Sequence, residues 1–180
     1  MIKWLTFLVI CMGMLGSNAQ TAKPVYHPCF LMDSIDKHLE FIKKNTQRIF
    51  VDTFDCRQTL LDSIAIHYTN SKNKKYLDAL NYIRVYGDAK VEDLYTDIVK
   101  RFCEADFAGF LNELYVSKGQ LQSLEKELIT TMNMIIDGRS LKQKYIGQMN
   151  VEIAKAKDKK DTARLYYLEK LKVKIDEERY

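Results

Sequence analysis

The sequence predicts an all-α protein: an antiparallel bundle of about six to seven helices that follows a cleaved signal peptide. Glycine and proline are scarce, with 7 Gly and 2 Pro in 180 residues. A β-sandwich or barrel needs a turn signal about every 8–12 residues, so this composition argues against both. Hydrophobic residues instead recur at helical spacing along most of the chain.

Residues 1–19 have the organisation of a secretory signal peptide. Lys3 precedes an apolar run from Trp4 to Leu15, and Ser17 and Ala19 supply the small residues that signal peptidase recognises. The run is shorter than the roughly 20 apolar residues of a membrane-spanning helix. We therefore expect cleavage before Gln20, no transmembrane anchor in the mature chain, and a periplasmic or extracellular protein.

The mature residues 20–180 are the size of one domain, and their first half predicts four helices. Residues 20–28 form an extended arm, and Pro28 suits the first turn of a helix. The polar cluster 69–74 and Gly87 mark helix ends. The hydrophobic residues at helical spacing are Leu31, Ile35, Leu39, Ile42 and Ile49 in the first helix, Phe54, Leu61, Ile64, Ala65 and Tyr68 in the second, Tyr76, Leu77, Leu80 and Ile83 in the third, and Val91, Leu94, Tyr95, Ile98 and Phe102 in the fourth.

The second half predicts one long helix and two further ones. Asp106 begins a segment in which hydrophobic residues fall seven apart, and the phase holds across Gly119, which favours a single helix up to residues 137–138. A sixth helix follows from Leu141. Residues 157–180 form a charged C-terminal helix. The seam consists of Phe107, Leu114, Leu121, Leu128 and Ile135, the sixth helix uses Leu141, Tyr145, Met149, Ile153 and Ala156, and the last uses Leu165, Leu168, Leu171 and Ile175.

No internal repeat is clear enough to predict a solenoid. Paired short helices between residues 74 and 116 leave a helical-repeat architecture open. The simpler arrangement, an antiparallel bundle with short loops, is favoured.

Removal of Cys11 with the signal peptide leaves three cysteines, and export permits disulfides. In an up-and-down bundle the start of the first helix and the end of the fourth lie at the same end. We therefore expect a Cys29–Cys103 disulfide, with Cys56 at the opposite end as a buried free thiol. The alternative is that all three are ordinary core residues.

The sequence contains no recognisable catalytic or metal-binding motif. His27 and Cys29 lack the further closely spaced ligands of a zinc site, and His38 and His67 are isolated. There is no nucleophile elbow, HExxH, phosphate-binding glycine loop or EF-hand spacing. We predict no cofactor and no metal, and we expect a binding protein rather than an enzyme.

Two surface features suggest partners. The stretch 139–160 is basic, but export makes nucleic acid an improbable ligand; a solvated helix face, or attraction to anionic lipid or acidic glycans, accounts for it better. Tyr82, Tyr86, Tyr166 and Tyr167 lie beside or off the apolar stripes of their helices. Because tyrosine is favoured in recognition surfaces, these four residues are the predicted interaction surface.

The predicted function is therefore that of an exported, non-enzymatic helical protein that binds another macromolecule, with a protein as the expected partner, as an inhibitor, immunity protein or adaptor. Two alternatives stay open. One is a small-ligand-binding bundle of the cell envelope, in which Met132, Met134 and Met149 could line the ligand cavity. The other is an envelope hydrolase with an unrecognised site.

Overall fold

The computed structural model describes residues 35–46, 57–86, 92–136 and 139–177. The prediction of an all-α protein is confirmed, because these residues form seven helices and only one two-residue antiparallel ladder, β1 (Ile135–Ile136) with β2 (Arg139–Ser140). The predicted signal peptide and arm, residues 1–28, lie outside the described residues. The helices are α1 (Ile35–Lys44), α3 (Arg57–Ser71), α4 (Lys74–Tyr86), α5 (Glu92–Val116), α6 (Gln122–Asn133), α7 (Leu141–Asp158) and α8 (Thr162–Glu177).

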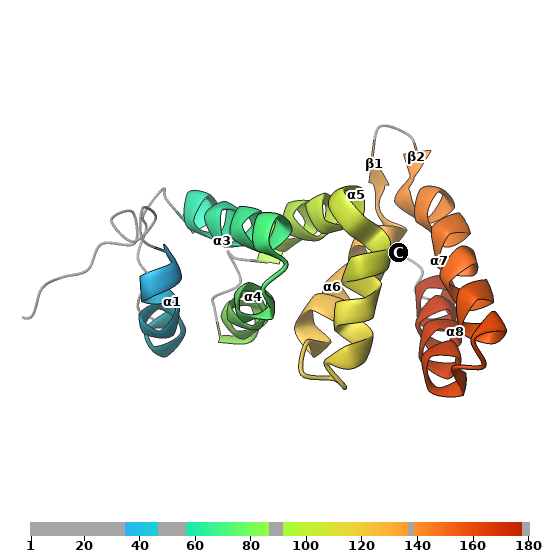
Figure 1. Cartoon of the computed structure of the whole chain (residues 1–180). Coiled ribbons are helices and arrows are strands. Elements are labelled where there is room, and N and C mark those ends of the chain that lie inside the picture. The colour runs from blue at the N-terminus through green and yellow to red at the C-terminus, as the bar shows by residue number, and fades with distance from the viewer. Residues whose placement is uncertain (1–34, 47–56, 87–91, 137–138, 178–180) are drawn as a thin grey trace, which may run out of the picture.

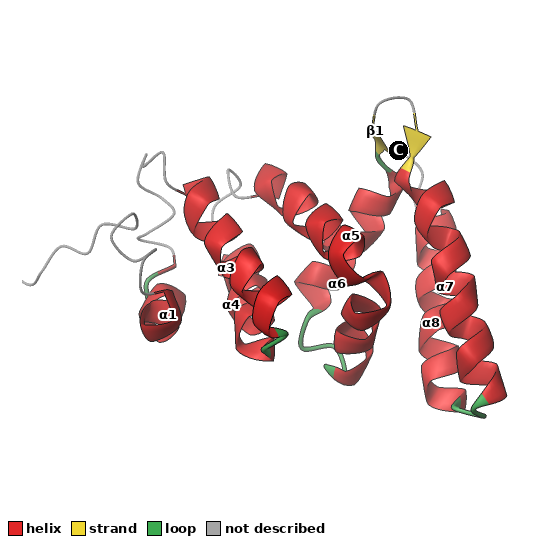
Figure 2. Ribbon diagram, turned by 45° about the horizontal axis from the view of Figure 1, so that its top comes forward, coloured by secondary structure: helices red, strands yellow, loops and turns green. Residues whose placement is uncertain are grey.

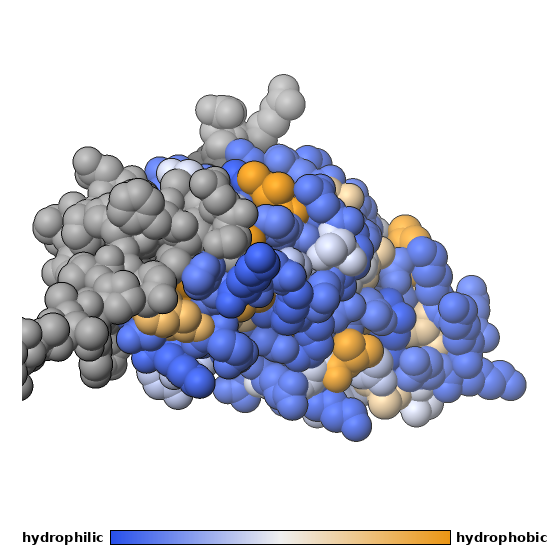
Figure 3. All heavy atoms as spheres, turned by 60° about the vertical axis from the view of Figure 1, so that its left-hand side comes forward, coloured by the Kyte–Doolittle hydropathy of each residue, from blue (hydrophilic) through white to orange (hydrophobic). Residues whose placement is uncertain are grey.

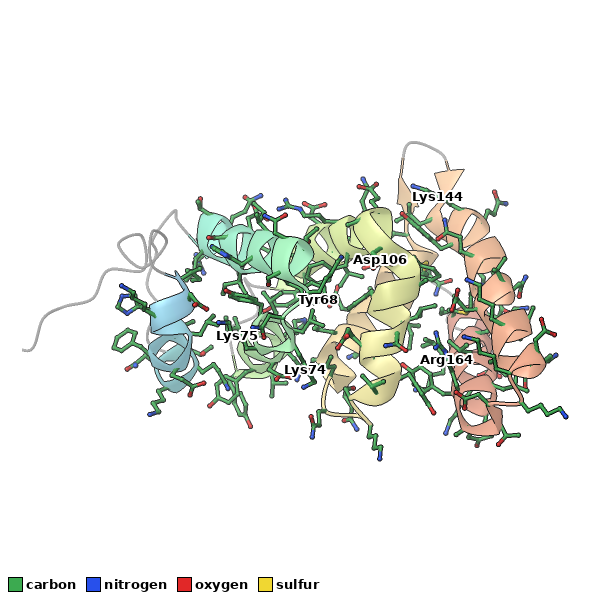
Figure 4. The ribbon with its side chains drawn as sticks, in the orientation of Figure 1. Tyr68, Lys74, Lys75, Asp106, Lys144 and Arg164 are labelled. Atoms are coloured by element: carbon green, nitrogen blue, oxygen red, sulfur yellow. The ribbon has the colours of Figure 1, made fainter. Side chains whose placement is uncertain are left out.

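Six of the helices form three antiparallel hairpins, α3–α4, α5–α6 and α7–α8, which stand side by side in a row (Figure 1). Each first helix contacts the first helix of the next hairpin, and each second helix contacts the next second helix. α1 contacts α4 at one end of the row, where Lys75 of α4 (Figure 4) forms an ion pair with Asp36 of α1. The prediction of an all-α helical bundle is confirmed, and the hairpins of this bundle stack in a row.

The three hairpins share a structural unit that is centred on a lysine with left-handed backbone conformation. Lys72, Lys118 and Lys160 have φ values of 55°, 48° and 56°, and each follows the first helix of its hairpin. Figure 2 shows the three hairpin turns along one edge of the row. Buried residues recur at four matching positions before each lysine: Tyr68, Leu114 and Ala156; Ala65, Leu111 and Ile153; Ile64, Phe110 and Glu152; and Leu61, Phe107 and Met149.

This repeat is hard to detect in the sequence because the matching positions share burial but not residue identity. The third position, for example, holds Ile64, Phe110 and a glutamate, Glu152. Glu152 is accommodated in the interior of the third hairpin by two ion pairs, with Arg164 of α8 at 3.0 Å and with Lys155 at 2.7 Å. Packing neighbouring hairpins requires a buried surface of suitable shape, which different side chains can provide.

The predicted single helix from Asp106 to residues 137–138 is wrong. Residues 117–121 form a turn between α5 and α6, and Gly119 has φ +86°. Leu114, Leu121 and Leu128 are all buried, but they lie on α5, in the turn and on α6 rather than along one helix. Their spacing of seven residues continues through the turn, which is why the sequence pattern suggested an uninterrupted seam.

The predicted start at Asp106 is confirmed as a local break within α5 (Figure 4). Asp106 has non-helical backbone angles, φ −168° and ψ 79°, and its Oδ1 accepts a hydrogen bond from the Gly109 backbone N–H at 2.9 Å. This is the geometry of a helix N-cap. A side chain at Gly109 would collide with the Asp106 carboxylate, so the glycine leaves room for the cap.

The predicted hydrophobic stripes form the core wherever the structure describes them. Among the described stripe residues only Leu94, Leu141 and Leu165 are partly rather than fully buried. One continuous cluster runs through all three hairpins and α1. The face shown in Figure 3 is mainly hydrophilic, with separate hydrophobic side chains. Over the described residues, no helix has the length and hydrophobicity needed to cross a membrane.

Candidate functional site

A groove with a volume of about 590 Å³ lies between the second and third hairpins. The end of α5, the α5–α6 turn, the first half of α6 and one side of α8 form its walls, so the stacking of the hairpins creates it. We call it the tyrosine–lysine groove. Its lining residues are Tyr115, Lys118, Gly119, Gln122, Glu125, Lys126, Tyr167 and Lys174.

Two tyrosines from different hairpins form the aromatic part of the groove. The rings of Tyr115 and Tyr167 lie with centroids 5.6 Å apart at an interplanar angle of 45°. The Tyr167 hydroxyl donates a hydrogen bond to Glu125 Oε2 at 2.9 Å. Burial, and then the neighbouring Glu125 carboxylate, raises the pKa of Tyr167 well above its usual range, so the side chain stays a neutral hydrogen-bond donor at physiological pH.

Glu125 ties the two walls of the groove together. Its Oε1 accepts a charge-assisted hydrogen bond from Lys174 Nζ at 2.7 Å, while Oε2 accepts the bond from Tyr167. The glutamate side chain is only 16% exposed. Because both carboxylate oxygens bind groups on α8, the tyrosine and lysine are held in defined positions before any ligand arrives.

The rim of the groove carries an excess of positive charge. Lys118 and Lys126 are exposed, and Lys174 is partly exposed beside Glu125. Three lysines against one glutamate leave a local charge of about +2 among the lining residues. Such a rim attracts negatively charged groups and raises their rate of association.

The turn that supplies Lys118 and Gly119 is held by the preceding hairpin. Asn81 of α4 accepts hydrogen bonds at Oδ1 from the backbone N–H groups of Ser123 (3.0 Å) and Leu124 (3.3 Å), and its Nδ2 donates to the carbonyl of Gln120 at 3.0 Å. Asn81 thus caps the start of α6 in place of a local side chain. The other two hairpins use local caps, Asn73 and Asp161, which directly follow their left-handed lysines.

The four predicted interaction tyrosines do not form one surface. Tyr82 and Tyr86 stack on each other on α4, with ring centroids 4.4 Å apart. Tyr167 lines the tyrosine–lysine groove, whereas its neighbour Tyr166 points to another side of α8 and is 69% exposed. The sequence placed all four outside the core stripes, but only the tertiary structure separates them into three locations.

The groove also contains residues that sequence patterns alone do not single out. Tyr115 and Glu125 lie within the stretch whose spacing predicts one long helix, and Glu125 has the pattern of a solvated face. The sequence signal that could identify this part of the groove is Gly119, because glycine adopts left-handed backbone readily and therefore favours a turn at residues 117–121. The seven-residue hydrophobic spacing obscures that signal.

Cys103 is a free thiol in the structure and is 3% exposed. Burial raises the pKa of Cys103 to about 12, which makes the thiol a poor nucleophile at neutral pH. Cys29 and Cys56 lie outside the described residues. The structure therefore gives no support to a Cys29–Cys103 disulfide, and that pairing stays a prediction.

The three methionines named as possible ligand-cavity residues, and His67, do not line the tyrosine–lysine groove. Met132 and Met149 are buried in the core and Met134 is exposed, but none of them lines the groove. His67 stacks on Tyr76 with ring centroids 5.4 Å apart. Among the described residues, no cluster of three or more His, Cys, Asp or Glu side chains has the arrangement of a metal site.

Comparison of the chain with known proteins finds no matching family model, no matching curated protein and no matching solved structure.

Proposed function

We propose that this protein is an exported, non-enzymatic helical scaffold that binds another protein through the tyrosine–lysine groove. An inhibitor, immunity or adaptor role is compatible with such binding. The observation that carries the proposal is the pair of tyrosine rings, Tyr115 and Tyr167, inside a groove with a lysine rim, where Glu125 accepts a hydrogen bond from Tyr167.

Three properties of the groove support protein binding. Tyrosine is enriched at protein interfaces because its ring offers a large apolar surface and its hydroxyl a polar contact. The hydrogen bond from Tyr167 and the ion pair from Lys174 to Glu125 restrict the side chains before binding, which reduces the entropy lost on association. The excess of lysine favours a partner segment with Asp or Glu side chains.

The export part of the proposal rests on the leader at residues 1–19. The test is N-terminal sequencing of the protein recovered from the compartment outside the cytoplasm. We expect the mature chain to begin at Gln20. Recovery of the full-length chain from the cytoplasm alone would overturn this part of the proposal.

The binding part can be tested by photo-crosslinking in the cells that produce the protein. A photoreactive phenylalanine derivative replaces Gln122, which lines the groove, and in a matched control replaces Val85, an exposed residue of α4. We expect a covalent adduct with one major protein at position 122 and not at position 85. Equal adducts at the two positions, or only a small-molecule adduct at position 122, would contradict the proposal.

The captured partner then allows a quantitative test of the rim. The double substitution Lys118→Glu and Lys126→Glu reverses two exposed charges at the groove and should weaken binding at least about tenfold, with a larger effect at low salt. The control is Lys159→Glu with Lys160→Glu, an equal charge change in the exposed α7–α8 turn. An equal loss of affinity in both variants would show that only the net charge of the protein matters.

A further inference from the structure

We propose that the tyrosine–lysine groove takes a carboxylate-bearing segment of its partner, and that Glu125 competes with this segment for Lys174. This inference rests on the proposed function, because it concerns the same groove. It adds the chemical group that the groove recognises and the residue of this chain that limits the affinity. In the free protein Lys174 Nζ binds Glu125 Oε1 at 2.7 Å, and in the complex a carboxylate of the partner takes the place of Glu125.

The α8 wall of the groove already binds a carboxylate, which is that of Glu125. Lys174 and Tyr167, both on α8, donate hydrogen bonds to its two oxygens at 2.7 and 2.9 Å. An ammonium group and a phenol hydroxyl that converge on one carboxylate form short, charge-assisted hydrogen bonds. The internal contact between α6 and α8 therefore indicates the kind of group that suits these donors.

Lys118 and Lys126 supply positive charge that Glu125 does not neutralise. Both side chains are exposed at the groove, and no carboxylate of the described residues forms an ion pair with either of them. Glu125 is the one carboxylate among the lining residues. A partner segment with two or more carboxylates can therefore pair with Lys118 and Lys126 and then compete for Lys174.

Lys174 is the group that can exchange between the two carboxylates. Its side chain is 45% exposed, whereas that of Glu125 is 16% exposed. Lysine carries its charge on a flexible stem, and a partly exposed ion pair contributes little to stability, so its replacement by an equivalent pair costs little. Tyr167 has a second contact, with the Tyr115 ring at a centroid distance of 5.6 Å. The exchange therefore leaves the aromatic part of the groove in place.

Glu125→Gln separates competition from positioning. Glutamine keeps a side-chain oxygen that can accept the hydrogen bond from Tyr167, but it loses the charge that holds Lys174. Two unit charges about 4 Å apart change the affinity about fivefold in bulk water, and by more in a less polar site. If Glu125 competes with the partner, its neutral replacement should therefore bind an acidic segment at least about fivefold more tightly. If Glu125 only positions the groove, the same substitution should weaken binding or leave it unchanged.

The test uses a capped pentapeptide with four glutamates around a central leucine, and the same peptide with glutamine in place of glutamate. Titration of the isotope-labelled mature protein, followed by NMR, gives both the affinity and the place of binding. We expect the glutamate peptide to bind with a dissociation constant on the order of 1 mM, and its shift changes to centre on Lys118, Gly119 and Gln122. The glutamine peptide should bind at least about tenfold more weakly.

The matched control for Glu125→Gln is Glu169→Gln. It makes the same change of charge on α8 and releases Lys157 from a 3.5 Å ion pair, but it lies outside the tyrosine–lysine groove. We expect Glu169→Gln to change the affinity for the glutamate peptide less than about twofold, because an exposed charge at a distance is screened by salt. An equal gain in affinity in both variants would show that only the net charge of the protein matters, which would overturn the inference.

Lys174→Gln distinguishes an exchange of partners from repulsion at a distance. If Glu125 acts by holding Lys174, Glu125→Gln should have little effect in the Lys174→Gln background, whereas repulsion predicts the same gain in both backgrounds. A measurement on the unsubstituted protein gives an independent answer. The NMR signals of the Lys174 ammonium group and the Glu125 carboxylate should both shift when the glutamate peptide saturates the protein, and unchanged signals would overturn the exchange.

The outcomes separate this inference from the proposed function. Unchanged or weaker peptide binding by Glu125→Gln, with helical content retained in circular dichroism, would overturn the competition. Equal binding of the two peptides, or no binding of the glutamate peptide, would overturn the recognition of carboxylates. The crosslink at position 122 tests the protein partner without regard to its charge, so its failure would instead overturn the proposed function.

Discussion

The cap that Asn81 provides for α6 leads to a specific prediction about stability. Asn81→Ala removes the acceptor for two backbone N–H groups, at 3.0 and 3.3 Å, and the donor to the Gln120 carbonyl, at 3.0 Å. Loss of an N-cap side chain costs about 1 kcal/mol, and loss of the second hydrogen bond costs about another 1 kcal/mol. We therefore expect the free energy of unfolding to fall by about 2 kcal/mol.

Denaturant unfolding followed by circular dichroism measures this loss, which corresponds to a decrease in melting temperature of about 4–8 °C for a chain of this size. Two comparison variants test the mechanism. Asn73→Ala removes only a local cap, the bond from the Lys75 backbone N–H at 3.1 Å, and should cost about 1 kcal/mol. Asn81→Asp keeps the acceptor at a helix N-terminus, where negative charge is favourable, and should cost less than Asn81→Ala.

The same variants define the result that would refute the reasoning. If Asn81→Ala destabilises the protein no more than Asn73→Ala, the contact between the first and second hairpins contributes nothing beyond an ordinary cap. If Asn81→Asp is as harmful as Asn81→Ala, the side chain does not stabilise α6 by accepting hydrogen bonds. Asn70→Ala, at an exposed residue near the end of α3, is the neutral reference.

Three other predictions concern residues elsewhere in the row. Gly147→Ala should raise the free energy of unfolding by about 0.5–1 kcal/mol, because Gly147 lies within α7 with open space around it. Gly119→Ala should lower the free energy of unfolding by about 1 kcal/mol, because Gly119 has φ +86°. Denaturant unfolding of both variants tests the contrast. Glu127→Ala should lower the free energy of unfolding by about 3–5 kcal/mol, because the largely buried Arg84 loses its 3.1 Å ion pair with Glu127. Adding Arg84→Met should recover part of that loss in a double-mutant cycle. The Cys103 thiol, with its pKa raised by burial, favours the folded state below pH 9; this contribution should disappear as the pH rises from about 9 to 12, and Cys103→Ala should reduce the slope of stability against pH over that range.

The amino-acid sequence was sufficient for the local structure of most of the described chain. Scarce glycine and proline and a helical hydrophobic period predicted an all-α fold. The predicted core stripes are buried, and Asp106 begins a helical segment as expected. These features depend on interactions within a few residues, such as caps and amphipathic faces, so they can be read directly from the order of side chains.

The tyrosine–lysine groove illustrates what the sequence could not provide. Tyr115 and Tyr167 are far apart in the chain, yet their rings are 5.6 Å apart because α8 packs beside the second hairpin. Glu125 has the pattern of a surface glutamate until Tyr167 and Lys174 are placed next to it. No local rule specifies such a meeting, because it depends on the angle and order in which the hairpins stack.

The turn at residues 117–121 shows why one of the local predictions also failed. The hydrophobic spacing continues through Gly119, so a single helix and a hairpin are equally compatible with the periodicity of the buried residues. The hairpin has hydrogen bonds within its turn, such as that from the Gln120 N–H to the Ser117 carbonyl at 3.0 Å, and contacts from outside the segment add the bonds from Ser123 and Leu124 to Asn81. The sequence by itself therefore determined the helices and their buried faces, whereas the tertiary structure decided where the long segment folds back, because Asn81 of another hairpin adds its hydrogen bonds to those within the turn.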